Sequence, residues 1–368
     1  MNRRQIMLGG ATAVLAGGVA ATWGATRTGS LDAYTDYVLA QRQPLTAGGA
    51  DRELVRYATL AANGHNTQPW LFRRGEGGGL SIRPDMSRRT PVVDPDDHHL
   101  YASLGCAAEN LALAASAQGR GGEIRFVPAE GEGARLDFVP GRASDGPEDM
   151  IAAIPERQST RSEYDGRPVS AADLTALAEA ARMPGVDMVL ITDRPALTQV
   201  RDLVVAGNTA QIADPAFVRE LKDWLRFSPR QALQRNDGLF TAASGNPVMP
   251  AWLGGTMFDL FFTAEAENEK YARQLASSAG VAVFLAERDD PEHWVRAGRA
   301  CQRFALKATA LGLRHAFINQ PVEVPGLRDD MARLAGMPGR RPDIVMRFGY
   351  GPLWPYSPRR PVEAVLTA

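Results

Sequence analysis

The sequence predicts an α+β fold in which a single chain carries two related halves. Short apolar runs typical of strands alternate with longer segments whose apolar residues recur at helical spacing. Two of these helical segments, residues 104–119 and 297–312, match each other at a constant offset of 193 positions. Between them, residues 141–147 are rich in Gly, Ser, Asp and Pro, which is typical of a connection between folded units. We therefore expect a first half over residues 31–145 and a second half over residues 150–368.

The composition is that of a folded protein without the charge of a nucleic-acid binder. Of 368 residues, 45% are hydrophobic and 23% are charged, enough for one large core or two ordinary ones. The formal net charge is -1 at pH 7, and no basic stripe with interleaved aromatic residues occurs. We therefore expect no nucleic-acid partner.

The N-terminal segment differs from the rest of the chain. Arg3 and Arg4 precede a weakly apolar, Gly/Ala-rich run over residues 8–21, which resembles a twin-arginine export signal over residues 1–30. The alternative is a chance arginine pair before a short anchor helix. No other apolar run reaches the ~18 residues that a spanning helix needs. The signal predicts an exported, periplasmic protein that meets the twin-arginine export machinery and has no membrane span in its mature form.

In the first half, the expected elements follow one another closely. The polar segment 30–49 contains a short helix, and a loop with several prolines over residues 88–97 precedes the last helix. The main elements are a helix at 52–62, a strand at 70–74, a Gly-rich turn at 75–79, a strand at 80–83 and a helix at 98–118.

A loop between the first helix and the first strand of this half carries the polar groups of greatest interest. Gly64 accepts unusual backbone angles, and Pro69 removes a donor and pushes Gln68 out of the helical region. The loop displays amide side chains, which donate and accept hydrogen bonds in one plane and so suit a flat heteroaromatic ligand. The alternative is a turn that is bonded to itself through Asx contacts.

The two matching helices share small residues as well as an apolar face. Gly105 aligns with Gly298 and Gly119 with Gly312, and five alanine or leucine positions between them also match. Small residues on a buried stripe allow close approach of two helices. Duplication of one unit explains the match. Convergence of two Ala-rich helices is the alternative.

The second half contains a long insertion. We expect a segment at 205–280, rich in aromatics, to act either as a lid or as a packing arm. The other expected elements are a helix at 171–181, strands at 188–192 and 278–286, a helix at 294–311, and strands at 316–320 and 343–351.

Four stretches together resemble the FMN-dependent nitroreductase superfamily. They are Asn66-Thr67-Gln68-Pro69-Trp70, the run I-P-E-R-Q-S-T-R at 154–161, the helix at 294–312 and the run V-M-R-F-G-Y-G-P at 345–352. Their order looks most like the single-chain, internally duplicated Acg-type branch. The resemblance implies a nitroreductase-like fold in which two fused halves form a pseudo-dimer around one FMN.

The resemblance also implies which residues hold the cofactor. The basic-x-Ser-x-basic pattern places Arg157, Ser159 and Arg161 on the phosphate, and guanidinium groups suit that role because their planar fork bonds two oxygens. A second cationic clamp comes from the tail, either Arg359 or Arg360. On the ring and ribityl chain the resemblance places Asn63, Gly64, Asn66 and Gln68, and near the ring's N5 it places Asn319 and Gln320. The family usually has Ser-Ser where this chain has Asn63-Gly64.

No side chain is expected to act as a nucleophile or a base, because a flavin carries the chemistry itself. His65 is interpreted as a structural loop residue or an acid/base group, the former being favoured. His98 and His99 are not expected to bind a metal, because adjacent histidines point apart on a helix. Cys106 and Cys301 are expected to be buried thiols, with a bridge as the alternative.

The expected function is hydride transfer from reduced FMN to a nitro, quinone or conjugated acceptor of small size. NAD(P)H or a redox partner protein would supply the electrons. Two alternatives stay open: a flavin-binding protein for storage or sequestration that does not turn over, and a structural relative without a cofactor.

Overall fold

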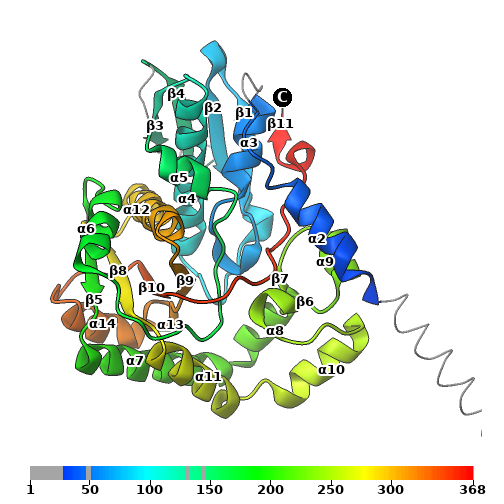
Figure 1. Cartoon of the computed structure of the whole chain (residues 1–368), viewed down its shortest axis with the longest axis vertical. Coiled ribbons are helices and arrows are strands. Elements are labelled where there is room, and N and C mark those ends of the chain that lie inside the picture. Colours follow the sequence, from blue (N-terminus) through cyan, green and yellow to red (C-terminus); the bar gives the residue numbers. More distant parts are fainter. Residues whose placement is uncertain (1–27, 47–50, 129–132, 143–145, 368) are drawn as a thin grey trace, which may run out of the picture.

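A computed structural model of the chain describes residues 28–46, 51–128, 133–142 and 146–367. The predicted export signal lies almost wholly outside the described residues, as does the centre of the predicted join at 141–147. The molecule is built from two larger, mostly antiparallel sheets and a two-stranded parallel sheet, with helices between and around them (Figure 1). The α+β prediction is confirmed.

The first sheet has the strand order β11-β1-β2-β4-β3, and the second has the order β5-β8-β10-β9. The last strand of the chain joins the first sheet, where Phe72 pairs in parallel with Leu366. The strands are β1 (Trp70–Arg74), β2 (Leu80–Pro84), β3 (Gly122–Val127), β4 (Arg135–Pro140), β5 (Val186–Ile191), β6 (Leu225–Arg226), β7 (Leu239–Phe240), β8 (Gly280–Ala286), β9 (Arg314–Phe317), β10 (Ile344–Gly349) and β11 (Leu366–Thr367).

Several helices begin at a residue whose side chain caps the helix. Ser170 accepts a hydrogen bond from the Asp173 backbone N–H, and Asp290 accepts one from the His293 backbone N–H. The helices are α2 (Leu31–Ala40), α3 (Asp51–Thr59), α4 (His98–Ala117), α5 (Glu148–Ala153), α6 (Ala171–Ala180), α7 (Arg194–Ile212), α8 (Pro215–Asp223), α9 (Pro229–Arg235), α10 (Ala251–Phe261), α11 (Ala264–Ala276), α12 (Pro291–Ala310), α13 (Gln320–Glu323) and α14 (Arg328–Leu334). Among the described residues, none of these helices is both long and apolar enough to cross a membrane.

Both faces of the second sheet are covered, which explains the continuous apolar runs of its central strands. Phe284 and Phe348 face α12, where Phe304 packs against them. Val283 and Val345 face the opposite side, toward α7 and α14. Every residue of β8 and β10 is therefore buried.

Helices α4 and α12 cross at the centre of the molecule, and two glycines set their separation (Figure 1). A Cβ added to Gly105 would lie 2.1 Å from the Val295 carbonyl oxygen, and one added to Gly298 would lie 1.9 Å from the Ala102 carbonyl oxygen. The two contacts are related by the same offset of 193 positions that relates the helices in sequence. The crossing is thus reciprocal: each helix presents its glycine to the corresponding carbonyl of the other.

Five strands of the described chain, β3, β4, β6, β7 and β11, were not expected from the sequence. β3 and β4 lie where no strand was expected, after the helix at 98–118. Their burial is low and uneven: β3 has no buried residue, and β4 buries only Leu136 and Phe138. Both nevertheless carry an alternating apolar pattern: Ile124 and Phe126 of β3 pack against the core that contains Leu136 and Phe138 of β4.

Candidate functional site

One cavity of about 520 Å³ is lined from several elements and is within the size range of small-molecule and cofactor sites. Its polar lining comes from the loop after α3, the first turns of α4, Arg161, the segment around α13 and polar residues of the segment 205–280. More than half of the lining residues come from the segment 205–280, which contributes most of the apolar side chains. The apolar lining includes Phe217, Leu221, Leu225, Phe227, Leu239, Met249, Met257, Phe258, Phe261 and Phe262.

Asn63 and Gly64 both line this cavity. The Asn63 Oδ1 accepts the Gln68 backbone N–H at 2.9 Å, and the Gly64 backbone N–H donates to Ser103 Oγ at 3.3 Å. The self-bonded turn that the sequence left as an alternative is therefore present at Asn63. Asn63 also lines the cavity, so the same residue belongs to both the turn and the cavity wall.

Asn66 and Gln68 do not line the cavity. The Asn66 Nδ2 donates to the carbonyl oxygens of Gly238 and Pro358 at 3.1 Å each. The Gln68 Nε2 donates to the Asn236 carbonyl at 2.8 Å, and its Oε1 accepts the Arg360 backbone N–H at 2.7 Å. These amides instead tie the loop to the insertion and to the C-terminal tail.

The loop holds this arrangement with an uncommon backbone. His65, Asn66 and Gln68 all have φ between 45° and 54°, in the left-handed region that residues with a Cβ seldom adopt. The polar contacts of Asn66 and Gln68 stabilise that conformation. Burial, with the charge of Arg161 second, lowers the pKa of His65 to about 4.

Arg161 lines the cavity, and its guanidinium has no hydrogen-bond or ion-pair partner within the described part of the chain. Arg157, which was predicted to hold the phosphate, does not line the cavity: it is 3% exposed, and its Nη2 donates to the Leu60 carbonyl at 3.1 Å. Its Nε and Nη1 are buried without a described partner. Burial lowers the pKa of both arginines from the ordinary value. Ser159 forms an isolated bridge with His315 and is not part of the cavity wall.

A buried N–H group without a hydrogen-bond acceptor destabilises the folded protein, and a bound anion can supply the missing acceptor. On the cavity wall, the guanidinium of Arg161 is therefore the group that fits a phosphate.

Arg359 and Arg360, the predicted tail clamp, are used within the protein. Arg359 donates to the carbonyls of Thr59, Leu60 and Ala61, at 2.6 to 3.3 Å, and so caps the C-terminal end of α3. Arg360 pairs with Asp85 at 3.1 Å. Neither is among the residues that line the cavity, so the structure does not bring them to the predicted site.

Asn319 and Gln320 do lie on the cavity wall. The Asn319 Oδ1 accepts the Val345 backbone N–H at 2.9 Å, which fixes the turn between β9 and α13. The Gln320 Oε1 is buried without a described partner. Of the predicted cofactor residues, the structure gathers Asn63, Gly64, Arg161, Asn319 and Gln320 around one cavity.

Sequence analysis missed several polar residues of the wall. They include His99 from α4, Gln211 from α7, Tyr271 from α11 and Glu323 from α13. They come from four elements far apart in the sequence, and none belongs to a motif. Only their burial inside otherwise polar helices would have marked them.

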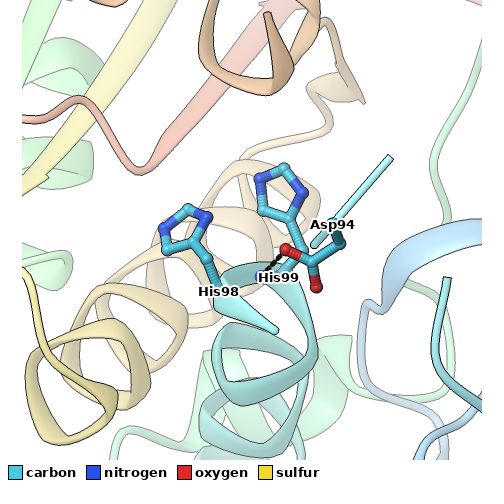
Figure 2. A group of neighbouring side chains, drawn as sticks. All are labelled: Asp94, His98 and His99. Atoms are coloured by element: carbon cyan, nitrogen blue, oxygen red, sulfur yellow. Dashed lines mark hydrogen bonds between the residues drawn. The ribbon is translucent and has the colours of Figure 1, made fainter. Parts of the chain in front are cut away.

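His98 and His99 lie next to each other, contrary to the expectation that they point apart. Their ring centroids are 4.6 Å apart, with Asp94 close by (Figure 2). Both residues stand in the first turn of α4, whose N-cap residue Asp97 is in the left-handed conformation at φ 61°. Asp94, His98 and His99 group together closely enough to consider a metal. However, the Asp94 carboxylate already accepts the backbone N–H groups of His99 and Leu100 at 2.9 Å each, as a helix cap.

Behind this cap, His98 and Asp343 form a buried neutral pair. The His98 Nε2 lies 2.9 Å from Asp343 Oδ1. Burial raises the pKa of Asp343 to about 7 and lowers the pKa of His98 to about 4. The folded state therefore loses stability through Asp343 as pH rises from about 4 to about 7. Through His98 it loses stability as pH falls from about 6.5 to about 4.

Because these two effects oppose each other, single substitutions should separate them. We expect Asp343→Asn to remove the first effect. Between pH values of about 4 and 6.5, the slope of the unfolding free energy against pH should then be more positive than in the wild type, by about 1 kcal/mol per pH unit. Urea unfolding at several pH values measures this slope. An unchanged slope would show that Asp343 is already ionised in the folded protein.

Both cysteines are buried free thiols. The Cys106 Sγ lies 3.1 Å from the Gly298 carbonyl oxygen at the helix crossing, and Cys106 also reaches the cavity wall.

Comparison with known proteins identifies the class. The family model described as "Nitroreductase family" matches residues 154–351, more than half of the chain. The chain therefore belongs to the nitroreductase family. Among curated relatives, it is 27% identical over 329 residues to the protein of Mycobacterium tuberculosis (strain ATCC 25618 / H37Rv) named as NAD(P)H nitroreductase Rv3131. That alignment covers 86% of this chain and 90% of the relative.

Solved structures similar to this chain include two nitroreductases. One is a nitroreductase with bound FMN from Desulfitobacterium hafniense DCB-2, at 16% identity and a TM-score of 0.36, covering 58% of this chain and 94% of that one. The other is the FMN-dependent nitroreductase NfnB from Mycobacterium smegmatis in complex with NADPH. It has 14% identity and a TM-score of 0.36, covering 55% of this chain and 88% of that one.

Proposed function

We propose that the chain binds FMN in the cavity and passes hydride from the reduced flavin to a small nitro, quinone or conjugated acceptor. The observation that carries the proposal is Arg161, a cation without a described partner, on the wall of a cavity that Asn63 and Gly64 also line. A ligand that combines an anionic group with a flat polar ring fits this lining. Family membership supports the same conclusion.

Bound FMN would supply the redox chemistry, and the protein would hold and shield it. Arg161 would hold the phosphate by charge-assisted hydrogen bonds. Asn63, Gly64, Asn319 and Gln320 would orient the ring. The apolar side chains of the segment 205–280 would exclude water. NAD(P)H is the proposed electron donor, because the relatives carry that name.

Three further features belong to this proposal. The reciprocal glycine contacts of α4 and α12 support an internal duplication of the Acg type, with both halves building one site. The share of the cavity wall that comes from residues 205–280 supports a lid. The paired arginines of residues 1–30 support twin-arginine export to the periplasm.

A second candidate function is flavin storage or sequestration, which is favoured by the extent to which residues 205–280 surround the cavity. One experiment separates it from an enzyme. The purified protein is expected to be yellow with flavin absorbance, and anaerobic NAD(P)H is expected to bleach it. A yellow protein that stays oxidised with NAD(P)H and with dithionite-reduced carrier proteins would favour storage, and a colourless protein that takes up no added FMN would refute both functions.

A further inference from the structure

One corner of the cavity contains a carboxyl group that the cofactor does not account for. Glu323 ends α13 and lines the cavity together with His99 and Gln211. Its Oε2 accepts the Gln211 Nε2 at 2.6 Å. Its Oε1 lies 3.7 Å from the His99 Nδ1, which is longer than a hydrogen bond. One carboxyl oxygen is therefore held, and the other is uncommitted at the cavity surface.

His99 is oriented from behind by the main chain. Its Nε2 lies 3.3 Å from the Asp343 carbonyl oxygen, which can only accept a hydrogen bond. The ring proton is therefore assigned to Nε2, and Nδ1 presents a lone pair toward Glu323. Burial lowers the pKa of His99, so the ring is neutral. A neutral imidazole beside a carboxyl group can take up a proton and return it.

The surroundings favour the protonated form of the Glu323 carboxyl group. Burial is the main cause that raises its pKa, and the charge of Asp94 acts in the same direction, whereas His99 and Gln211 act against it. From the other elements packed around it, Tyr271 faces it from α11, and Arg328 of α14 donates through Nε to the Val322 carbonyl at 2.7 Å. No full positive charge pairs with the carboxylate within the described residues.

The other groups on the cavity wall are poorer proton donors. Burial raises the pKa of Tyr271 to about 12, which makes its phenol a weak acid. His65, with a pKa of about 4, carries no proton to give at neutral pH. Glu267 lies 3.4 Å from Lys270 in an ion pair. Glu323 is the carboxyl group of the wall that is neither paired with a cation nor exposed.

We propose that Glu323 donates the proton that completes reduction of the acceptor, and that His99 relays its replacement. The proposal rests on the proposed function. A quinone or nitro acceptor takes an electron pair and one hydrogen as hydride, which leaves negative charge on an acceptor oxygen. The Glu323 O–H bond breaks as the new O–H bond on the acceptor forms. The resulting carboxylate keeps the Gln211 hydrogen bond and regains a proton from water through the His99 ring.

Glu323→Gln tests the assignment, because the amide preserves shape and still accepts from Gln211. Glu269→Gln, an exposed position on α11 with 67% side-chain exposure, is the matched control. The first readout needs no flavin. In infrared difference spectra at neutral pH, we expect the wild type minus Glu323→Gln to show the carbonyl band of a protonated carboxylic acid, and the control difference to show none.

The second readout follows the reduced, flavin-loaded protein as it is reoxidised. With a quinone we expect Glu323→Gln to react about 100-fold more slowly than the wild type, in line with loss of a general acid. With ferricyanide, which takes single electrons without a proton, we expect equal rates. NAD(P)H should reduce both proteins equally.

Absence of the infrared band, or equal quinone rates in Glu323→Gln and the wild type, would overturn the assignment. Slowing with quinone and ferricyanide alike would also overturn it, because it would indicate a structural role. A protein that binds no flavin would still show the band, so failure of the proposed function is distinguishable from failure of this inference.

Discussion

Gly298→Ala is expected to be the most destabilising single-methyl change in the protein. The added Cβ would lie 1.9 Å from the Ala102 carbonyl oxygen, a backbone atom of a buried helix that cannot rotate away. Helices α4 and α12 would have to separate along their whole contact, which joins the two sheets. We expect the free energy of unfolding to fall by about 3 kcal/mol or more, the upper end of the range for overpacked cores.

Thermal and urea unfolding measure this loss, and a second helical glycine provides the control. A Cβ at Gly255 in α10 would meet only the flexible end of Lys222, at 3.6 Å. Gly255→Ala should therefore be neutral or stabilise the helix by up to about 1 kcal/mol. Equal stability of Gly298→Ala and the wild type would mean that the helices do not cross at these glycines.

Combining Arg157→Ala with Arg161→Ala is expected to give a folded but colourless protein. A flavin phosphate is a dianion, and removal of its guanidinium partners leaves it desolvated and unpaired. The apoprotein should fold at least as well as the wild type, because the Arg157 Nε and Nη1 are buried without a described partner. Absorbance of the purified protein and titration with FMN measure the effect.

The matched control replaces two exposed arginines, Arg273 and Arg333, by alanine. That pair should retain the yellow colour, since surface ion pairs contribute little and lie away from the wall. Stoichiometric FMN in the Arg157→Ala, Arg161→Ala protein would show that the phosphate lies elsewhere.

Sequence periodicity was sufficient for the elements with a continuous buried face. The strand at 70–74 and the helix at 98–118 match β1 and α4 within a residue, because their apolar positions repeat at the period of the element. β3 and β4 were missed although their apolar residues alternate, with Ile124 and Phe126 in β3 and Leu136 and Phe138 in β4. Each strand has only two such positions, and so short an alternation does not distinguish a strand from a loop.

Contacts with residues remote in sequence explain which site residues were predicted correctly and which were not. Arg161 and Asn319 sit on segments whose direction the motifs define, and both reach the cavity. Whether an amide such as Asn66 faces a ligand or ties down a loop depends on Gly238 and Pro358, which are remote in sequence. Arg359 likewise donates to a carbonyl group at the end of α3 and does not line the cavity.

The rule that adjacent histidines diverge on a helix failed for a local reason. His98 and His99 lie in the first turn of α4, directly after a left-handed residue, where ring directions are set by Asp343 rather than by helical spacing. His99 of this cluster also lines the cavity. The left-handed backbone conformation of Asp97, which precedes the two histidines, could not be predicted from the sequence.

The central claim is that the amide-bearing loop and Arg161 hold one flavin between them. A crystal structure of the protein grown with FMN tests this most directly. We expect a phosphate on Arg161 and an isoalloxazine ring between Asn63-Gly64 and Asn319-Gln320. A flavin bound anywhere else, or a cavity filled by the side chains of residues 205–280 with no flavin, would contradict it.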